Sequence, residues 1–179
     1  MWSCNRTRGL VLLAASAVLA AFLAGCGFEP LYGRGAGGDV EAQLSAVKIQ
    51  TIPGRVGQQV HNYLLDRINR KGRPEDPLYL LSVTLEVSKI RLGIEQDERA
   101  TRAKLVILAT VRLQDVVTEE VLLDRSARST NSYNIVDSAV STRSAELDAV
   151  DRAAREVSDE IRLMLSLYFR RQNTQRAAR

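Results

Sequence analysis

Apolar and polar residues alternate over residues 78–129, as they do in strands that have one buried and one solvent-facing side. The first run begins at Leu78, and from Leu81 to Val87 its apolar side chains occupy odd positions. From Ile90 the apolar residues occupy even positions instead. A one-residue change of phase within a strand predicts a β-bulge, here near Ser88-Lys89.

Two more strands follow the first. The run at 105–113 is apolar on both sides, which is typical of a central strand. A turn over 115–120 leads to a third run, predicted to end at about residue 129. Because the connections are short, we predict an antiparallel three-stranded meander.

Helical periodicity flanks this meander on both sides. Residues 55–71 carry apolar side chains at every fourth position, before Gly72 and Pro74 end the run. The four apolar positions are Val56, Val60, Leu64 and Ile68.

A longer helix is predicted after a polar, irregular segment at 129–138. Ser141 or Thr142 is the expected N-cap, and an apolar stripe continues to Tyr168. A stripe of this length also suits a coiled coil, but beside so many strands a core helix is favoured.

A short strand is predicted at 44–52, before the first helix. The order is then β-α-β-β-β-α. Two one-sided helices and a half-exposed sheet predict an α+β, two-layer sandwich, with about four strands and both helices packed on one face. Residues 44–169 would form a single domain.

The chain begins like a lipoprotein signal peptide. Arg6 and Arg8 precede an apolar run at 9–23, and Leu23-Ala24-Gly25-Cys26 places small residues just before a cysteine. A lipoprotein signal peptidase cuts at such a site, and the thiol forms a thioether to diacylglycerol. We expect residues 1–25 to be removed and Cys26 to carry lipid. The alternative, an uncleaved inner-membrane anchor, would need about 20 apolar residues.

The two ends of the mature chain are predicted to lie outside the domain. Residues 26–43 would form the lipidated tether, with a flexible break at 34–39. Phe28, Leu31 and Tyr32 are too apolar for a solvated linker, so they would pack either on the protein's own domain or on a partner. The arginine-rich residues 170–179 have no periodicity and are expected to be disordered.

The charge distribution argues against nucleic acid as a partner. The 25 Lys and Arg outnumber the 21 Asp and Glu, for a formal net charge of +4. The excess comes from Arg6, Arg8 and the arginines of 170–179, so the folded part is not basic.

Few residues could support catalysis or metal binding. Cys4 and Cys26 are the only cysteines, and both are assigned to the signal peptide and the lipid. His61 is the only histidine and is expected on the surface or partly packed. No Gly-x-Ser-x-Gly or phosphate-binding loop occurs. We predict no enzyme activity, no metal and no cofactor beyond the covalent lipid.

Basic residues gather around the connection between the first two strands of the meander: Lys89, Arg91, Arg99, Arg102 and Lys104. The acids of the same connection, Glu95, Asp97 and Glu98, could neutralise them. The alternative is a phosphorylated ligand such as the lipid A and inner core of lipopolysaccharide, because arginine suits phosphate.

Several motifs together resemble those of one known family. The first is the cleavage motif Leu23-Ala24-Gly25-Cys26, the lipobox, which continues directly into Gly27-Phe28-x-Pro30-Leu31-Tyr32-Gly33. The others are Val56-Gly57-Gln58, Thr101-Arg102 and Ser132-Tyr133-Asn134. On these residues the chain is similar to the lipopolysaccharide-assembly lipoproteins LptE, also called RlpB.

The resemblance implies a function that composition alone does not. LptE proteins plug the lumen of the LptD β-barrel and assist its assembly. The pair forms the outer-membrane translocon that receives lipopolysaccharide from a periplasmic bridge and inserts it into the outer leaflet. Gly27, rather than aspartate, after the lipidated cysteine points to the outer membrane.

Two other functions remain open at this point. One is a periplasm-facing lipoprotein that acts as a ligand-binding or transporter accessory module without a barrel partner. The other is a small lipoprotein hydrolase that uses His61.

Overall fold

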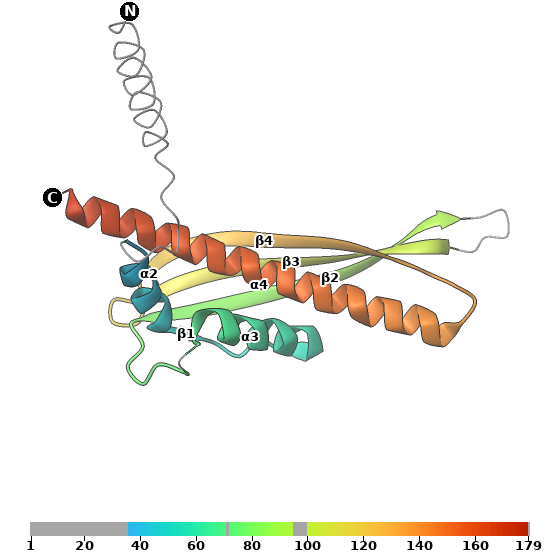
Figure 1. The fold of residues 1–179 in the computed structure, drawn as a ribbon, viewed down its shortest axis with the longest axis horizontal. Helices are drawn as coiled ribbons and strands as arrows, with labels where there is room; N and C mark the ends of the chain where they lie inside the picture. Colours follow the sequence, from blue (N-terminus) through green and yellow to red (C-terminus); the bar gives the residue numbers. More distant parts are fainter. Residues whose placement is uncertain (1–35, 71, 95–99, 179) are drawn as a thin grey trace, which may run out of the picture. The chain divides into compact units, whose positions relative to one another are not determined.

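A four-stranded sheet is the centre of the fold in the computed structural model, which describes residues 36–70, 72–94 and 100–178 (Figure 1). Its strands lie in the order β1 (Val47–Ile49), β2 (Tyr79–Ile94), β3 (Ala100–Asp115) and β4 (Val121–Asn134). β1 runs parallel to β2, and the other neighbours are antiparallel. The predicted meander is confirmed, and β1 makes the sheet mixed because a helical crossover separates it from β2.

Three helices pack on one face of this sheet: α2 (Ala36–Ser45), α3 (Gly54–Ile68) and α4 (Ala139–Ala177) (Figure 1). The α+β class with helices on one face is confirmed, and the described residues form three helices where the sequence predicts two. α3 begins and ends within a few residues of its prediction, and Val60, Leu64 and Ile68 are buried.

The core lies between the helices and the odd-numbered residues of β2 and β3. In each pair of opposite residues on β2 and β3, the two residue numbers are either both odd or both even. The same holds for β3 and β4 as far as Leu113. One face therefore carries Leu105, Ile107, Ala109 and their odd-numbered neighbours, all buried. β3 is the central strand of the meander, as predicted. We call this the core face, and the even-numbered side the outer face.

The prediction of a β-bulge near Ser88-Lys89 is wrong. The register between β2 and β3 runs without a shift from Tyr79 to Leu92. The apolar residues change phase because β2 leaves the core after Leu85, so that Ile90 and Leu92 lie on the outer face. The register shift lies instead between β3 and β4, at Leu113/Gln114.

The N-terminal side of the domain differs from its prediction. Residues 36–39, expected in a flexible break, begin helix α2, and β1 is shorter than the strand predicted over 44–52. Val40 and Leu44 are four residues apart and fully or almost fully buried, so tertiary packing stabilises a helix despite the glycines at its start.

The C-terminal elements are longer than predicted. β4 continues to Asn134, and Ser138 caps α4 by accepting a hydrogen bond from the Ser141 N–H at 3.3 Å. The expectation of disorder at 170–179 is wrong for 170–177, which are the last turns of α4. They are held partly because Gln43 of α2 and Asn173 exchange two side-chain hydrogen bonds, at 3.0 and 3.1 Å.

Candidate functional site

The predicted basic cluster is divided between the two faces of the sheet. Lys89 and Arg91 have odd numbers and lie on the core face of β2, whereas Arg102 and Lys104 have even numbers and lie on the outer face of β3. Arg99 lies outside the described residues. Sequence proximity therefore overstates the cluster, because adjacent residues of a strand point to opposite sides.

Lys89 has its own counter-charge. Its Nζ forms an ion pair with Glu146 at the start of α4, and Arg143 Nη1 lies 3.2 Å from the same carboxylate. The hydrogen bond from Lys89 holds the pKa of Glu146 below its usual range. The acids expected to neutralise the cluster, Glu95, Asp97 and Glu98, lie outside the described residues. Among the described residues, Lys89 pairs with an acid of the last helix.

Arg102 and Lys104 lie beside exposed apolar residues. Arg102 is directly opposite Leu92, and Lys104 is directly opposite Ile90. Directly opposed side chains of an antiparallel pair are within contact reach. Ile90 and Leu92 are 47% and 38% exposed although the outer face elsewhere is mostly polar. We call these four residues the outer patch. It offers two cations and two apolar side chains on one surface.

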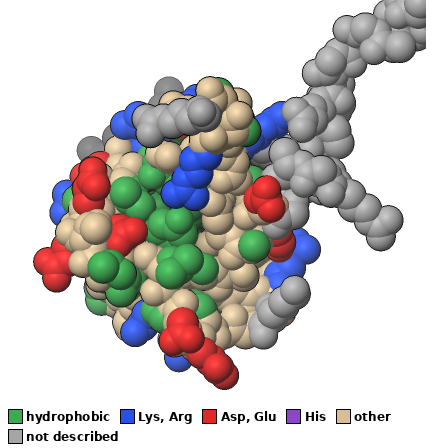
Figure 2. Space-filling view, turned by 90° about the vertical axis from the view of Figure 1, so that its left-hand side faces the viewer, with side chains coloured by type: hydrophobic (Ala, Val, Ile, Leu, Met, Phe, Trp, Pro, Cys, Tyr) green, Lys and Arg blue, Asp and Glu red, His purple; other side chains and the backbone are tan. Residues whose placement is uncertain are grey.

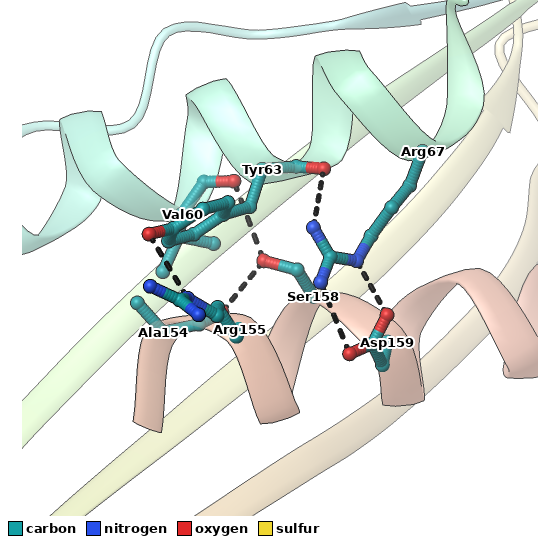
Figure 3. A network of polar contacts seen from close by, with 7 residues as sticks. All are labelled: Val60, Tyr63, Arg67, Ala154, Arg155, Ser158 and Asp159. Carbon is teal, nitrogen blue, oxygen red and sulfur yellow. Dashed lines mark hydrogen bonds and ion pairs between the residues drawn. The ribbon is translucent and has the colours of Figure 1, made fainter. Parts of the chain in front are cut away.

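A second polar group joins α3 to α4 (Figure 3). Tyr63 donates a hydrogen bond to Asp151, and its hydroxyl accepts one from Arg155 Nε at 3.2 Å. Arg67 Nη2 lies 3.0 Å from Asp159 Oδ2, which holds the pKa of Asp159 below its usual range. The Arg67 and Arg155 guanidinium groups also lie 5.3 and 5.5 Å from the centre of the Tyr63 ring.

This α3–α4 network is suited to joining helices and not to nucleophilic chemistry. The Ser158 hydroxyl is buried and donates to the Ala154 carbonyl oxygen of its own helix at 2.7 Å. The side chains around it are paired with one another across the helix interface. The sequence does not reveal the network, because Tyr63 belongs to α3 and its partners are about 90 residues further along.

His61 lies partly exposed on α3, with Nδ1 3.2 Å from the Gln50 carbonyl oxygen. Within the described ranges, no three His, Cys, Asp or Glu residues come close enough to hold a metal ion. None of the described helices is long and apolar enough to span a bilayer. Cys26 and the signal peptide lie outside the described residues.

Apolar side chains are exposed at the end of the sheet where β2 begins and β3 turns into β4. Leu78, Val116, Val117 and Val121 are between 43% and 86% exposed, and the Val116 N–H donates to the Leu78 carbonyl at 3.0 Å. Figure 2 faces this end and shows hydrophobic side chains gathered between acidic and basic ones. We call these four residues the apolar end.

The turn that carries the apolar end is ordered by Asp115. Its Oδ1 accepts hydrogen bonds from the N–H groups of Val117 and Thr118, at 2.8 and 3.0 Å. The bonds from Thr118 and Val117 lower the pKa of Asp115. The exposed valines are therefore held in place by the turn.

Comparison with known proteins gives a family match and several related folds. The model of a family described as "LptE: Lipopolysaccharide-assembly" matches residues 42–165. An uncharacterized protein, RP188, of Rickettsia prowazekii (strain Madrid E) is 25% identical over 126 residues, which is 70% of this chain and 78% of that protein.

Two solved structures share the fold. A candidate lipoprotein from Caulobacter crescentus CB15 has a TM-score of 0.61 and 23% identity, over 75% of this chain and 98% of that one. The rare lipoprotein B of Shewanella oneidensis has a TM-score of 0.53 and 10% identity, over 72% of this chain and 98% of that one. At these identities the likeness is one of fold.

Proposed function

Because the chain belongs to the LptE family of lipopolysaccharide-assembly lipoproteins, we propose that it is the non-enzymatic plug of an outer-membrane LptD β-barrel. In this proposal a lipid on Cys26 holds it at the outer membrane, and barrel and plug together insert lipopolysaccharide into the outer leaflet. The observation that carries the proposal is the family match, which spans every described strand and most of α4.

The surface of the domain supports a role inside a polar lumen. Apart from the outer patch and part of β3, the outer face is mostly hydroxyl, amide and charged side chains, including the ion pair of Arg112 with Asp124 at 2.9 Å. The interior wall of a large outer-membrane barrel is also polar. The apolar end supplies a place where a protein partner could make dry contacts.

The outer patch is the part of the predicted basic cluster best suited to lipopolysaccharide. Arg102 and Lys104 could meet phosphate groups while Ile90 and Leu92 meet the first carbons of acyl chains. Lys89 is a weaker candidate because Glu146 already pairs with it. Arg91 lies on the opposite face from the patch and would contact a ligand only if that ligand wrapped around the end of the strands.

Charge reversal tests the outer patch. We expect Arg102→Glu with Lys104→Glu to weaken binding to purified lipopolysaccharide by about tenfold or more and to flatten its dependence on salt, because two phosphate contacts would be lost. Arg55→Glu with Arg171→Glu, which reverses two exposed arginines on α3 and α4, is the matched control. If the outer-patch variant binds lipopolysaccharide as tightly as the control variant, the outer patch is not a lipopolysaccharide-binding surface.

The lipid anchor has a direct chemical test. Cells grown with labelled palmitate should label the mature chain, and Cys26→Ala should abolish the label and leave an unprocessed precursor. A mature wild-type product without label would contradict the assignment of Cys26.

Depletion tests the function in cells. Loss of the protein should leave newly made lipopolysaccharide in the inner membrane or periplasm while its synthesis continues. Normal delivery to the outer leaflet in depleted cells would favour an accessory lipoprotein without a barrel partner.

A further inference from the structure

The free edge of β1 opens into a cleft that the proposed function does not use. The cleft has a volume of about 690 Å³. β1 and the residues that follow it form one wall, and the C-terminal half of α3 with the segment leading to β2 forms the other. Its lining includes Lys48, Ile49, Thr51, His61, Asn69 and Arg73. This volume is within the range typical of ligand-binding clefts.

Backbone groups of β1 face this cleft. The Gln50 N–H donates to the Leu81 carbonyl of β2 at 2.9 Å, whereas the Val47 carbonyl is bonded on the side away from β2. Successive residues of a strand direct their backbone groups to opposite sides. Ile49 is two residues from Val47, so its N–H and C=O point away from β2. They lie at the unpaired edge of the sheet, where a further strand can be added.

Asn69 already partners this edge through its side chain. It is only 6% exposed, and its Nδ2 donates to the Val47 carbonyl at 3.1 Å and to the Ser45 carbonyl at 3.4 Å. Its Oδ1 is buried without a hydrogen-bond partner among the described residues. A buried acceptor is normally satisfied, and an N–H group entering along the edge of β1 would supply the missing donor.

The positive charge of the cleft favours extended segments that carry acidic side chains. Lys48 and Arg73 are exposed at its rim, and His61 adds a third nitrogen-bearing side chain. None of its described lining residues is Asp or Glu. An entering segment with an acidic side chain would therefore gain charge-assisted contacts, and one with a basic side chain would be repelled.

We propose that this cleft binds an extended segment of a partner protein, which pairs with the free edge of β1 and places an acidic side chain near Lys48 and Arg73. Main-chain hydrogen bonds to Ile49 would provide affinity, and the two cations would provide specificity. The site involves no lipopolysaccharide and is distant in sequence from the outer patch. If the cleft does not bind such a segment, the proposed function is unaffected.

The test uses two labelled peptides and the full mature chain in detergent. The first probe is a fluorescein-labelled Val-Asp-Val-Asp-Val peptide, and the second replaces both aspartates by lysine. We expect the acidic peptide to bind, the basic one to bind at least about tenfold more weakly, and hydrogen exchange at the amides of residues 47–51 to slow only with the acidic peptide.

Variants separate strand addition from simple charge attraction. Lys48→Glu with Arg73→Glu should lower affinity for the acidic peptide by about tenfold or more, whereas Arg125→Glu with Arg171→Glu, a pair outside the cleft, should leave it unchanged. Unchanged exchange at residues 47–51 would overturn the proposal even if the peptide binds. So would full competition by inorganic phosphate, which would make the cleft a simple anion site.

Discussion

At the scale of single residues, Gly57 shows why a short motif is tied to this fold. A Cβ atom at this position would lie 2.8 Å from the Ile52 carbonyl oxygen and 2.8 Å from Ile52 Cγ2. Glycine therefore lets the first turn of α3 lie directly against the chain that leaves β1. The sequence offers Val56-Gly57-Gln58 only as a resemblance, and the structure supplies the physical reason.

Gly57→Ala should destabilise the protein by about 1–3 kcal/mol, because backbone atoms of Ile52 would have to move. Helix propensity alone predicts the opposite sign, a gain of about 1 kcal/mol. Urea unfolding decides between them, with the exposed neighbour Gln58→Ala as the control. A stabilised Gly57→Ala protein would refute the close approach.

The ion pair of Arg67 and Asp159 makes a pH-dependent contribution to stability. Arg67 lowers the pKa of Asp159 in the folded state. The stabilisation is therefore complete above the unfolded pKa of aspartate, about 3.9, and is lost as pH falls through the lower folded value. Because the Asp159 side chain is 63% exposed, the ion pair should stabilise the protein by only about 0.5 kcal/mol.

Asp159→Asn should accordingly lower the free energy of unfolding at neutral pH, and the difference from wild type should shrink toward zero at about pH 2. Asp148→Asn removes the same charge from an exposed position of the same helix and is the control. Unfolding free energies at both pH values provide the measurement. A difference that is the same at both would show that protonation of Asp159 is not involved.

At the scale of whole elements, hydrophobic periodicity identifies the long strands and α3 because their buried sides are continuous. It does not identify α2, in which only Val40 and Leu44 supply the pattern and three glycines precede or begin the helix. It also misassigns the change of phase in β2, since a bulge and a strand leaving its core produce the same sequence pattern. Only the register distinguishes them.

The last turns of α4 and helix α2 support each other. Gln43 and Asn173 exchange hydrogen bonds, and Glu41 Oε2 lies 3.7 Å from Arg162 Nη2. Truncation after Arg171 removes Asn173 but leaves the buried Phe169 in place. We expect hydrogen exchange in residues 36–45 to quicken by about fivefold or more, while exchange in β3 stays unchanged.

The single substitution Asn173→Ala should reproduce part of this effect without shortening the chain. Thr174→Ala, an exposed neighbour on the same turn, is its control. If α2 exchanges equally in wild type and truncated protein, the last turns of α4 do not hold α2.

At the scale of the molecule, the α+β class, the helix-covered face and the family could all be inferred from sequence. The residues that make up each candidate site could not be inferred, because each site depends on contacts between residues that are far apart in the sequence. Register alone separates Lys89 from Lys104, and Glu146 is far from Lys89 in sequence. The cleft beside β1 likewise requires Asn69 to reach back to Val47.

We propose that this chain works as a partner of an outer-membrane barrel and not alone. The most direct measurement is purification of the tagged, full-length protein from outer membranes in mild detergent, with its partners identified and quantified by mass spectrometry. We predict an equimolar complex with a large β-barrel protein of the LptD kind. Recovery of the chain as a free lipoprotein, with no barrel retained, would contradict the account.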